Sequence, residues 1–289
     1  MLSVVIPTYN DSDLLPIAVA SALELKNLGE IIIVDDCSTD KTPELMSKFK
    51  QYSDRIKYFK NKTNLGVGFS FIKGIKRSNF PYILMCNSDD FFIPKKIDKL
   101  FYYLLNHDLE IAYGKMAIQK ENQVFKFSHA GYLPNNYVNS RNEFKDLLIF
   151  DMYMPSFGTI IKRSCLESFY NENYMRSLNK SYGSRFKAHD YDLFLNLSKK
   201  KVKTGFLNEF VCVWNPNNTS QSGDEYFKSG DAAEESAFLF NRYCNADNDF
   251  SSEDLKIIKD RIKQKFQRAK NIIPEKKLFL KQKYNEIFF

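Results

Sequence analysis

Short apolar segments alternate with helical patterns along the first 110 residues, and each segment ends in polar or charged residues. The expected strands cover residues 3–7, 31–34, 56–60 and 82–86, and the expected helices cover 13–25, 42–51, 67–77 and 94–106. Residues 31–34 are a continuous apolar run, which is typical of a parallel strand buried on both faces. The alternation predicts an α/β fold with a doubly wound, mostly parallel, Rossmann-like sheet.

The patterns between residues 111 and 250 are weaker. Strands are expected at 111–116, 124–127, 155–162, 202–206 and 210–214, and a helix is expected at 188–198. Clusters of Asn, Ser, Gly and Asp predict a loop over residues 217–250. We therefore expect one domain over residues 1–250, with halves 1–110 and 111–250, followed by a helical tail at 251–289.

The tail has its own helical pattern and most of the net charge. Ser251 and Asp254 resemble a capping box, and apolar residues then recur every three or four positions until Pro274. The tail has a surplus of six positive charges out of the net +7, so the body is nearly neutral and nucleic acid is not an expected partner. A basic amphipathic helix can lie on an anionic membrane surface. It can equally pack on the body or form a homodimer, and the pattern leaves these alternatives open.

The composition is that of a globular protein without a disulfide framework or a zinc site. The hydrophobic share of 44% and the charged share of 27% are ordinary. The five cysteines are widely spaced and form no CxxC pair, which favours reduced thiols. The chain opens on an expected strand rather than a signal peptide, and no apolar run is long enough to span a bilayer. We therefore expect a cytoplasmic protein.

Two adjacent carboxylates, Asp89 and Asp90, follow the expected strand at 82–86. Two like charges a few ångströms apart repel each other unless a cation lies between them. Hard divalent cations such as Mg²⁺ and Mn²⁺ bind oxygen ligands of this kind and often share them with substrate phosphates. The pair is therefore a candidate metal–diphosphate site, although Asn, Ser and Asp are also typical of a plain polar turn.

Other polar residues also follow expected strands. Asp36 can accept a hydrogen bond from a nucleotide base or ribose, or it can belong to a turn before the next helix. Tyr9 can stack on a base or simply pack. Asn64 opens a segment with two glycines that can approach a phosphate but lacks the third glycine of a dinucleotide-binding motif. Because ligands bind beyond the carboxyl ends of the strands in such sheets, these residues should converge on one crevice with the Asp pair.

Five short motifs follow one another over roughly residues 3–220. They are SVVIPTYN at 3–10, IIVDDCSTD at 32–40, NLG at 64–66, NSDD at 87–90 with Pro94 after it, and HDYDL at 189–193. Taken alone, the last motif does not indicate a catalytic role, because acids such as Asp190 and Asp192 are common at a helix start, where they suit the helix dipole. In this order the motifs resemble those of the family 2 inverting glycosyltransferases, whose fold is GT-A.

The resemblance implies a role for each matched residue. The implied nucleotide-binding residues are Pro7, Tyr9, Asp36, Asn64 and Asp89. Asp89 and Asp90 would hold Mn²⁺ or Mg²⁺ on the diphosphate of the donor. Asp190 would be the catalytic base that takes a proton from the acceptor hydroxyl.

The implied function is inverting transfer of a hexosyl or N-acetylhexosaminyl group from a nucleotide-diphosphate donor, expected to be a UDP-sugar. The acceptor would be a hydroxyl of a glycan or a lipid-linked sugar in surface polysaccharide synthesis, which would place the enzyme on the inner face of the membrane if the tail binds lipid. Three positions depart from the motifs of the family: Asn87 replaces an Asp, Asn215 stands where many relatives have a metal-binding His, and His189 replaces a Glu. The first two weaken the metal site, so the alternative is a catalytically inactive module that binds a sugar nucleotide.

Overall fold

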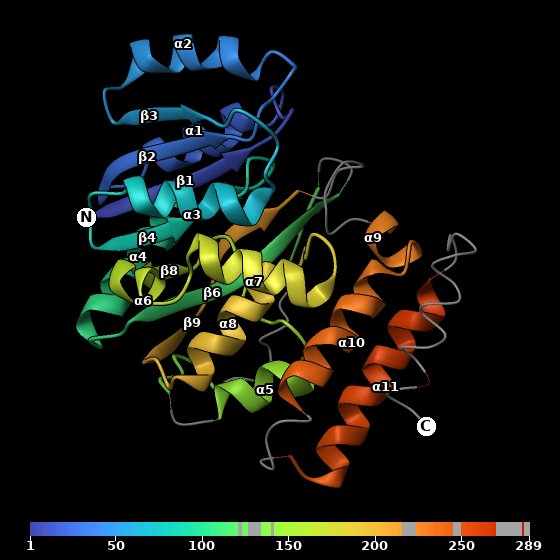
Figure 1. The fold of residues 1–289 in the computed structure, drawn as a ribbon. Coiled ribbons are helices and arrows are strands. Elements are labelled where there is room, and N and C mark those ends of the chain that lie inside the picture. The colour runs from blue at the N-terminus through green and yellow to red at the C-terminus, as the bar shows by residue number, and fades with distance from the viewer. Residues whose placement is uncertain are drawn as a thin grey trace.

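Nine strands form one mixed sheet in the part of the chain that the structure describes (Figure 1). The computed structural model describes residues 1–120, 123–126, 134–139, 142–215, 224–244, 250–269 and 285. The strands are β1 (Leu2–Thr8), β2 (Leu28–Asp35), β3 (Ile56–Lys60), β4 (Tyr82–Met85), β5 (Phe91–Phe92), β6 (Ile111–Lys120), β7 (Gln123–Lys126), β8 (Ile160–Lys162) and β9 (Thr204–Trp214). The helices are α1 (Leu15–Leu23), α2 (Thr42–Tyr52), α3 (Val67–Arg77), α4 (Pro94–Asn106), α5 (Glu143–Phe150), α6 (Arg163–Glu167), α7 (Glu172–Tyr182), α8 (His189–Lys199), α9 (Asp224–Lys228), α10 (Asp231–Tyr243) and α11 (Ser252–Arg268).

The first half of the sheet is parallel, as predicted. The strand order is β3-β2-β1-β4-β8-β6-β9-β5, with β7 paired to β6, and β1 to β4 all run in the same direction. Strands β1, β2 and β4 are buried almost throughout because they are mostly apolar and helices cover them, whereas β3 at the edge of the sheet is only partly buried. The predicted α/β fold with its doubly wound, mostly parallel sheet is therefore confirmed.

The second half of the sheet is mixed. Strand β8 runs antiparallel between β4 and β6, and β9 is parallel to β6. The two strands predicted at 202–206 and 210–214 are one continuous strand, β9. The register between β6 and β9 shifts where Asn208 and Glu209 lie, so these polar residues mark an irregularity inside a strand rather than its end. The strand predicted at 155–162 is shorter and covers only Ile160–Lys162.

The loop predicted at 217–250 is wrong for most of the part of that segment that the structure describes, which is helical. Helices α9 and α10 occupy residues 224–228 and 231–243, separated by Gly230, whose φ of 85° lies in the left-handed region that favours glycine. The buried face of α10 includes a carboxylate, Glu235, among small and apolar side chains. Because Glu235 is a charged residue at a buried position, the apolar residues of this segment do not recur with a clear helical period. The sequence pattern therefore did not predict a helix.

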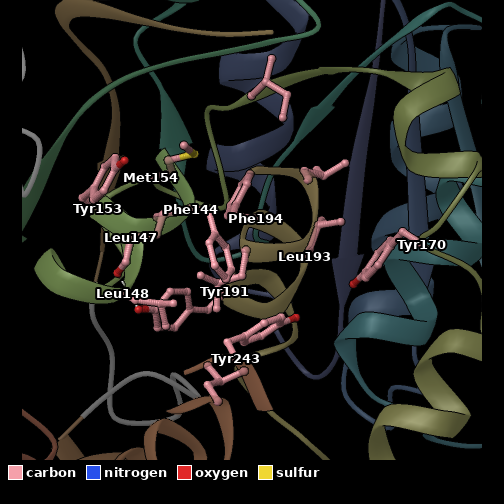
Figure 2. Close-up of a cluster of buried hydrophobic side chains, with 14 of the residues drawn as sticks. Phe144, Leu147, Leu148, Tyr153, Met154, Tyr170, Tyr191, Leu193, Phe194 and Tyr243 are labelled. Carbon is pink, nitrogen blue, oxygen red and sulfur yellow. Dashed lines mark hydrogen bonds between the residues drawn. The ribbon is translucent and has the colours of Figure 1, made fainter. Parts of the chain in front are cut away.

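Two apolar clusters lie on the two faces of the sheet. Successive residues of β1 point to opposite faces, so Val4 belongs to one cluster and Val5 to the other. The Val5 cluster extends from α3 to α5, α8, α10 and α11. Figure 2 shows the part around α8, where Tyr191 and Phe194 lie among side chains of α5 and α10.

The helix of the tail packs on the body. Ser251 and Asp254 form the predicted capping box, and Ile258 and Ile262 of α11 are buried in the Val5 cluster. Helices α10 and α11 lie side by side, far from the N-terminal end of the sheet (Figure 1). Helix α11 ends at Arg268 and Ala269 is extended, so the predicted stop at Pro274, which lies outside the described residues, is not what ends this helix. None of the helices in the described ranges has the length and apolar character needed to cross a bilayer.

Candidate active site

A cavity of about 1000 Å³ lies at the carboxyl ends of β1, β2 and β4. All the residues predicted for the site line it: Pro7, Tyr9, Asp36, Asn64, Asp89, Asp90 and Asp190. Its opposite wall comes from the segment before α8 and from α9, α10 and α11. The predicted convergence on one crevice is therefore observed, with a second wall that the sequence did not indicate.

Asp36 lines the cavity and also fixes the loop before α3. It is 3% exposed, and its Oδ1 accepts hydrogen bonds from Asn61 Nδ2 at 2.7 Å and from the backbone N–H of Leu65 at 2.9 Å. Its Oδ2 accepts from the backbone N–H of Gly66 at 2.6 Å. Gly66 has a φ of 98°, so this turn needs a glycine. One carboxylate thus joins the end of β2 to the glycine turn, and the second-strand and N-x-G motifs form a single unit.

The loop after β1 is held in a similar way. Asn10, with a left-handed φ of 55°, accepts a hydrogen bond from the backbone N–H of Thr39 at 2.8 Å, and its own N–H donates to Ser38 Oγ at 2.9 Å. The ring of Tyr9 is 47% exposed in the cavity wall. A fixed loop with an exposed aromatic ring can offer a flat face to a nucleotide base.

Asn64 has a cationic partner that the sequence did not indicate. Arg185, from the segment between α7 and α8, donates to Asn64 Oδ1 at 2.9 Å and to its carbonyl oxygen at 3.2 Å. Both residues line the cavity. The contact connects the strand-end wall of the cavity with the segment that leads to Asp190.

Three carboxylates, Asp11, Asp89 and Asp90, lie close together in the cavity wall after β1 and β4. Burial raises the pKa of Asp90 well above its usual range, and the neighbouring Asp89 carboxylate raises it further. Burial also raises the pKa of Asp11, to which Asp89 again contributes, although the Ser88 hydroxyl donates to Asp11 and acts in the opposite direction. Asp11 was missed in the sequence, although an acidic residue directly after the first-strand motif was a usable signal.

The two Asn residues that depart from the motifs of the family both contact Asp90. Asn87 Nδ2 donates to Asp90 Oδ2 at 2.8 Å, and the backbone N–H of Asn215 donates to Asp90 Oδ1 at 2.9 Å. The contact of Asn215 comes from its backbone and not from the side chain that replaces the metal-binding His of many relatives. Only the Asn87 contact depends on the side chain that departs from the motif, because the Asn215 donor is a backbone N–H group.

The chemistry of these carboxylates suits a divalent cation whose remaining oxygen ligands would come from elsewhere. Within the described ranges, no group of three or more His, Cys, Asp or Glu side chains is arranged to hold a metal ion by itself. Mutual repulsion among Asp11, Asp89 and Asp90 would nevertheless be relieved by a cation. Mg²⁺ and Mn²⁺ sites of this kind commonly use one or two carboxylates and take further oxygens from substrate phosphates.

Asp190 lies half-buried in the first turn of α8, with its side chain lining the cavity. Its Oδ1 accepts from the backbone N–H of Tyr191 at 2.9 Å. His189 beside it is buried, its Nδ1 is 2.7 Å from the Tyr170 hydroxyl, and burial lowers its pKa. Asp192 points away into the core, where its Oδ1 accepts from the Tyr243 hydroxyl at 2.6 Å. Of the acids in this motif, only Asp190 therefore faces the cavity.

Basic side chains line the wall opposite the strand ends. They are Arg185 and Lys187 before α8, and Lys265 and Arg268 on α11. Lys187 pairs with Asp231 at 2.6 Å and Lys265 pairs with Asp151 at 2.7 Å, whereas the Arg268 guanidinium lies 4.2 Å from the centre of the Phe227 ring. No motif marked these residues: Arg185 and Lys187 come from a segment without a recognisable pattern, and the helical pattern of the tail did not indicate that Lys265 and Arg268 face the cavity.

The comparisons with known proteins agree with this architecture. The family model described as "Glycosyl transferase family 2" matches residues 3–169. A Campylobacter jejuni GalNAc(5)-diNAcBac-PP-undecaprenol β-1,3-glucosyltransferase is 28% identical over 204 residues, which are 69% of this chain and 60% of that protein. The matched part spans about two thirds or less of the first curated relatives.

Solved structures share the fold at low sequence identity. Staphylococcus aureus TarS 1–349, in complex with UDP-GlcNAc, superposes with a TM-score of 0.64 at 16% identity and covers 99% of this chain and 79% of its own. A Pyrobaculum calidifontis mannosyltransferase, in complex with GDP-Man and Mn²⁺, gives a TM-score of 0.57 at 13% identity, with 89% of this chain and 67% of its own covered. The curled, mostly parallel sheet with its helices is thus the GT-A fold, and because the family model covers more than half of the chain, this protein belongs to glycosyltransferase family 2.

Proposed function

We propose that this protein transfers a hexosyl or N-acetylhexosaminyl group, with inversion, from a UDP-sugar to a hydroxyl of a glycan or lipid-linked acceptor in surface polysaccharide synthesis. The observation that carries the proposal is one continuous cavity with the strand-end carboxylates on one wall and Asp190 on another. Its volume of about 1000 Å³ is at the upper end of ordinary ligand pockets, which leaves room for a donor and an acceptor sugar together. The C. jejuni relative acts on an undecaprenol-linked glycan and TarS binds UDP-GlcNAc, and both support the substrate class.

In this proposal Pro7, Tyr9, Asp36, Asn64 and Asp89 bind the nucleotide. The exposed ring of Tyr9 supports base stacking. Asp36 Oδ1 already accepts from Asn61 and Leu65 and Oδ2 accepts from Gly66, so one lone pair of Oδ2 remains to accept from a base or ribose. Residues 1–110 then form the donor half, 111–250 the acceptor half, and 251–289 a tail whose helix contributes to the acceptor wall.

Asp190 is the proposed general base. The acceptor hydroxyl gives its proton to the Asp190 carboxylate while its oxygen attacks the anomeric carbon from the face opposite the diphosphate. Holding both substrates in line in one cavity removes much of the entropic cost of bringing them together. Asp89 and Asp90 would hold Mn²⁺ or Mg²⁺, which supplies Lewis-acid stabilisation of the departing diphosphate when it is bound.

A transfer assay with the Asp190→Asn variant tests the proposal. We expect the rate of sugar transfer to fall by about 100-fold or more, because general-base catalysis is lost. UDP with Mn²⁺ should still raise the melting temperature of the variant as it does for the wild type, since the nucleotide wall is intact. Asp260→Asn, which changes an exposed acid on α11, is the matched control and should keep full activity.

Two results would contradict the proposal. Undiminished transfer by Asp190→Asn would remove Asp190 from the chemistry. A wild-type protein that is stabilised by UDP but transfers no sugar from UDP, GDP or dTDP donors would instead support the alternative, an inactive module that binds a sugar nucleotide.

A cytoplasmic position at the inner face of the membrane is part of the proposal. A lipid-linked acceptor lies at that surface, and α11 carries exposed Lys256 and Lys263 on the side away from its buried Ile258 and Ile262. A basic helix face of this kind is attracted to anionic headgroups.

A further inference from the structure

A buried carboxylate from α10 closes the start of α8. Glu235 is 1% exposed, and its Oε1 accepts from the backbone N–H of Lys187 at 2.7 Å. Its Oε2 accepts from the backbone N–H of Ala188 at 3.0 Å. The N–H group of Ala188, the residue before α8, has no partner within the helix, and the Ala188 side chain cannot cap the helix. Glu235 therefore satisfies this N–H group and that of the preceding residue, Lys187, and so holds the backbone where α8 begins.

The capped turn is the one that carries the candidate base. Asp190 is the second residue of α8, two positions after the N–H group of Ala188. The body of α8 is held separately, since Leu193 and Phe194 are fully buried and the Tyr191 hydroxyl donates to the carbonyl of Leu147 at 2.7 Å (Figure 2). Packing thus fixes the helix axis, and Glu235 fixes the orientation of the backbone at its first turn.

The environment of Glu235 makes its charge sensitive to its neighbours. The Tyr226 hydroxyl of α9 donates to Glu235 Oε2 at 2.6 Å. Burial raises the pKa of Glu235 to about 7, and the Asp231 carboxylate adds to the rise, while the hydrogen bonds from Tyr226 and the two backbone N–H groups oppose it. Three other titratable or charged groups surround Glu235: Tyr182 of α7, Lys187 of the segment before α8, and Glu234 of α10.

We infer that Glu235 is a positioning residue for Asp190: its carboxylate aligns the first turn of α8 so that the Asp190 side chain faces the acceptor hydroxyl. The inference rests on the proposed function for its catalytic consequence, but the alignment itself is a property of the fold. Glu235 lies 45 residues after Asp190 on another helix, beyond the part of the chain that the family model matches.

Replacing Glu235 with Gln keeps the shape of the side chain but reduces the number of hydrogen bonds that it can accept. The amide has nearly the same volume but one acceptor oxygen in place of two, and its NH₂ group would face one of the two backbone N–H donors. Donor facing donor leaves that N–H unsatisfied, so the turn is expected to rotate or fray. Glu235→Asp, which keeps both oxygens on a shorter stem, should be affected less.

The first measurement is hydrogen exchange of peptides that cover residues 185–192, which does not depend on activity. We expect exchange there to be roughly tenfold faster in Glu235→Gln, with peptides of β1 to β4 unchanged. The second is transfer kinetics. We expect kcat to fall by about 10- to 100-fold because the base is displaced by a fraction of an ångström, while the UDP dissociation constant stays within about twofold. Glu253→Gln, at an exposed position of α11, removes the same charge and should match the wild type.

The pH profile gives a third readout. The wild type should lose activity as the pH falls through about 7, where Glu235 takes up a proton and becomes a weaker acceptor for the two N–H groups. Glu235→Gln cannot titrate and should lack this limb. Should Glu235→Gln not fold, Tyr226→Phe serves instead, because loss of the hydroxyl donor should shift the limb to higher pH.

The inference would be overturned if residues 185–192 of Glu235→Gln exchanged hydrogen at the same rate as in the wild type. It would also be overturned if the acidic limb of the pH profile of Tyr226→Phe were not shifted. A kcat and pH profile equal to those of the wild type would overturn it as well. If no version of the protein transfers sugar, the proposed function fails while faster exchange in the variant still supports the alignment by Glu235.

Discussion

Helix α3 crosses β1 at a glycine, and this close approach makes a quantitative prediction. A Cβ atom added to Gly74 would lie well inside van der Waals contact with Val5 Cγ1. Its next neighbours, Val34 Cγ2 at 3.4 Å and Val5 Cβ at 3.5 Å, are at ordinary contact distance. The obstruction to a larger side chain at Gly74 is therefore a single methyl group of a fully buried valine.

Each single substitution should destabilise the protein for a different reason. Gly74→Ala overpacks the core, at a cost of about 1 to 3 kcal/mol, offset by about 1 kcal/mol from better helix propensity. Val5→Ala deletes two buried methyl groups and leaves a cavity, at a cost of about 2 to 3 kcal/mol. Simple addition of the two effects gives a loss of about 2 to 5 kcal/mol for the double variant.

The double variant Val5→Ala/Gly74→Ala should be more stable than that sum by about 2 kcal/mol. The offending methyl group is gone, the new methyl group fills part of the cavity, and the helix propensity gain remains. Urea denaturation of the four proteins, followed by circular dichroism, gives the coupling free energy. Additivity within about 0.5 kcal/mol would show that Gly74 and Val5 do not compete for the same space, and would refute the packing argument.

Two further predictions concern charge. Burial raises the pKa of the Asp192 carboxyl from 3.8 to about 6, while the Tyr243 hydroxyl and Arg242 act in the opposite direction. The folded protein therefore binds a proton at Asp192 more tightly than the unfolded chain does. The resulting contribution to the free energy of unfolding is present below about pH 4 and is lost as the pH rises to about 6. Asp192→Asn should remove this pH-dependent loss, about 2 to 3 kcal/mol across the window, and urea denaturation at several pH values measures it; an unchanged slope would contradict the assignment. Charge reversal at the exposed residues, Lys256→Glu/Lys263→Glu, should weaken co-sedimentation with anionic vesicles by several-fold while the melting temperature stays near that of the wild type. Equal binding of the wild type and the variant to the vesicles would contradict the proposed membrane association.

The parallel half of the fold was predictable because several signals agree there. Prolines at the start of α1, α2 and α4 and continuous apolar runs in the strands set boundaries that differ from the observed ones by only a few residues. The strand-end motifs then located one wall of the cavity, because strand direction alone brings Pro7, Asp36 and Asp89 to the same edge.

The other wall was not predictable because its residues are placed by tertiary contacts. Arg185 reaches the cavity through its hydrogen bonds to Asn64, 121 positions earlier in the chain. Glu235 is buried only because Lys187, Ala188 and Tyr226 donate to it, and no local pattern encodes such a pairing. Asp11, on the strand-end wall, was predictable, since an acid directly after the first-strand motif is a signal for the candidate metal site.

The division of the cavity into two walls bears on how substrate specificity could change under the proposed function. The strand-end wall is built from motifs within residues 3–169, the part that the family model recognises, whereas Arg185, Tyr226 and Arg268 come after it. Under the proposed function, substitutions in α9 to α11 would alter the acceptor without disturbing donor recognition. Exceptions are residues that bridge the walls, as the Arg185–Asn64 contact does. Such a layout lets a lineage keep its sugar nucleotide and explore new acceptors, and it makes the bridging contacts the hardest positions to vary.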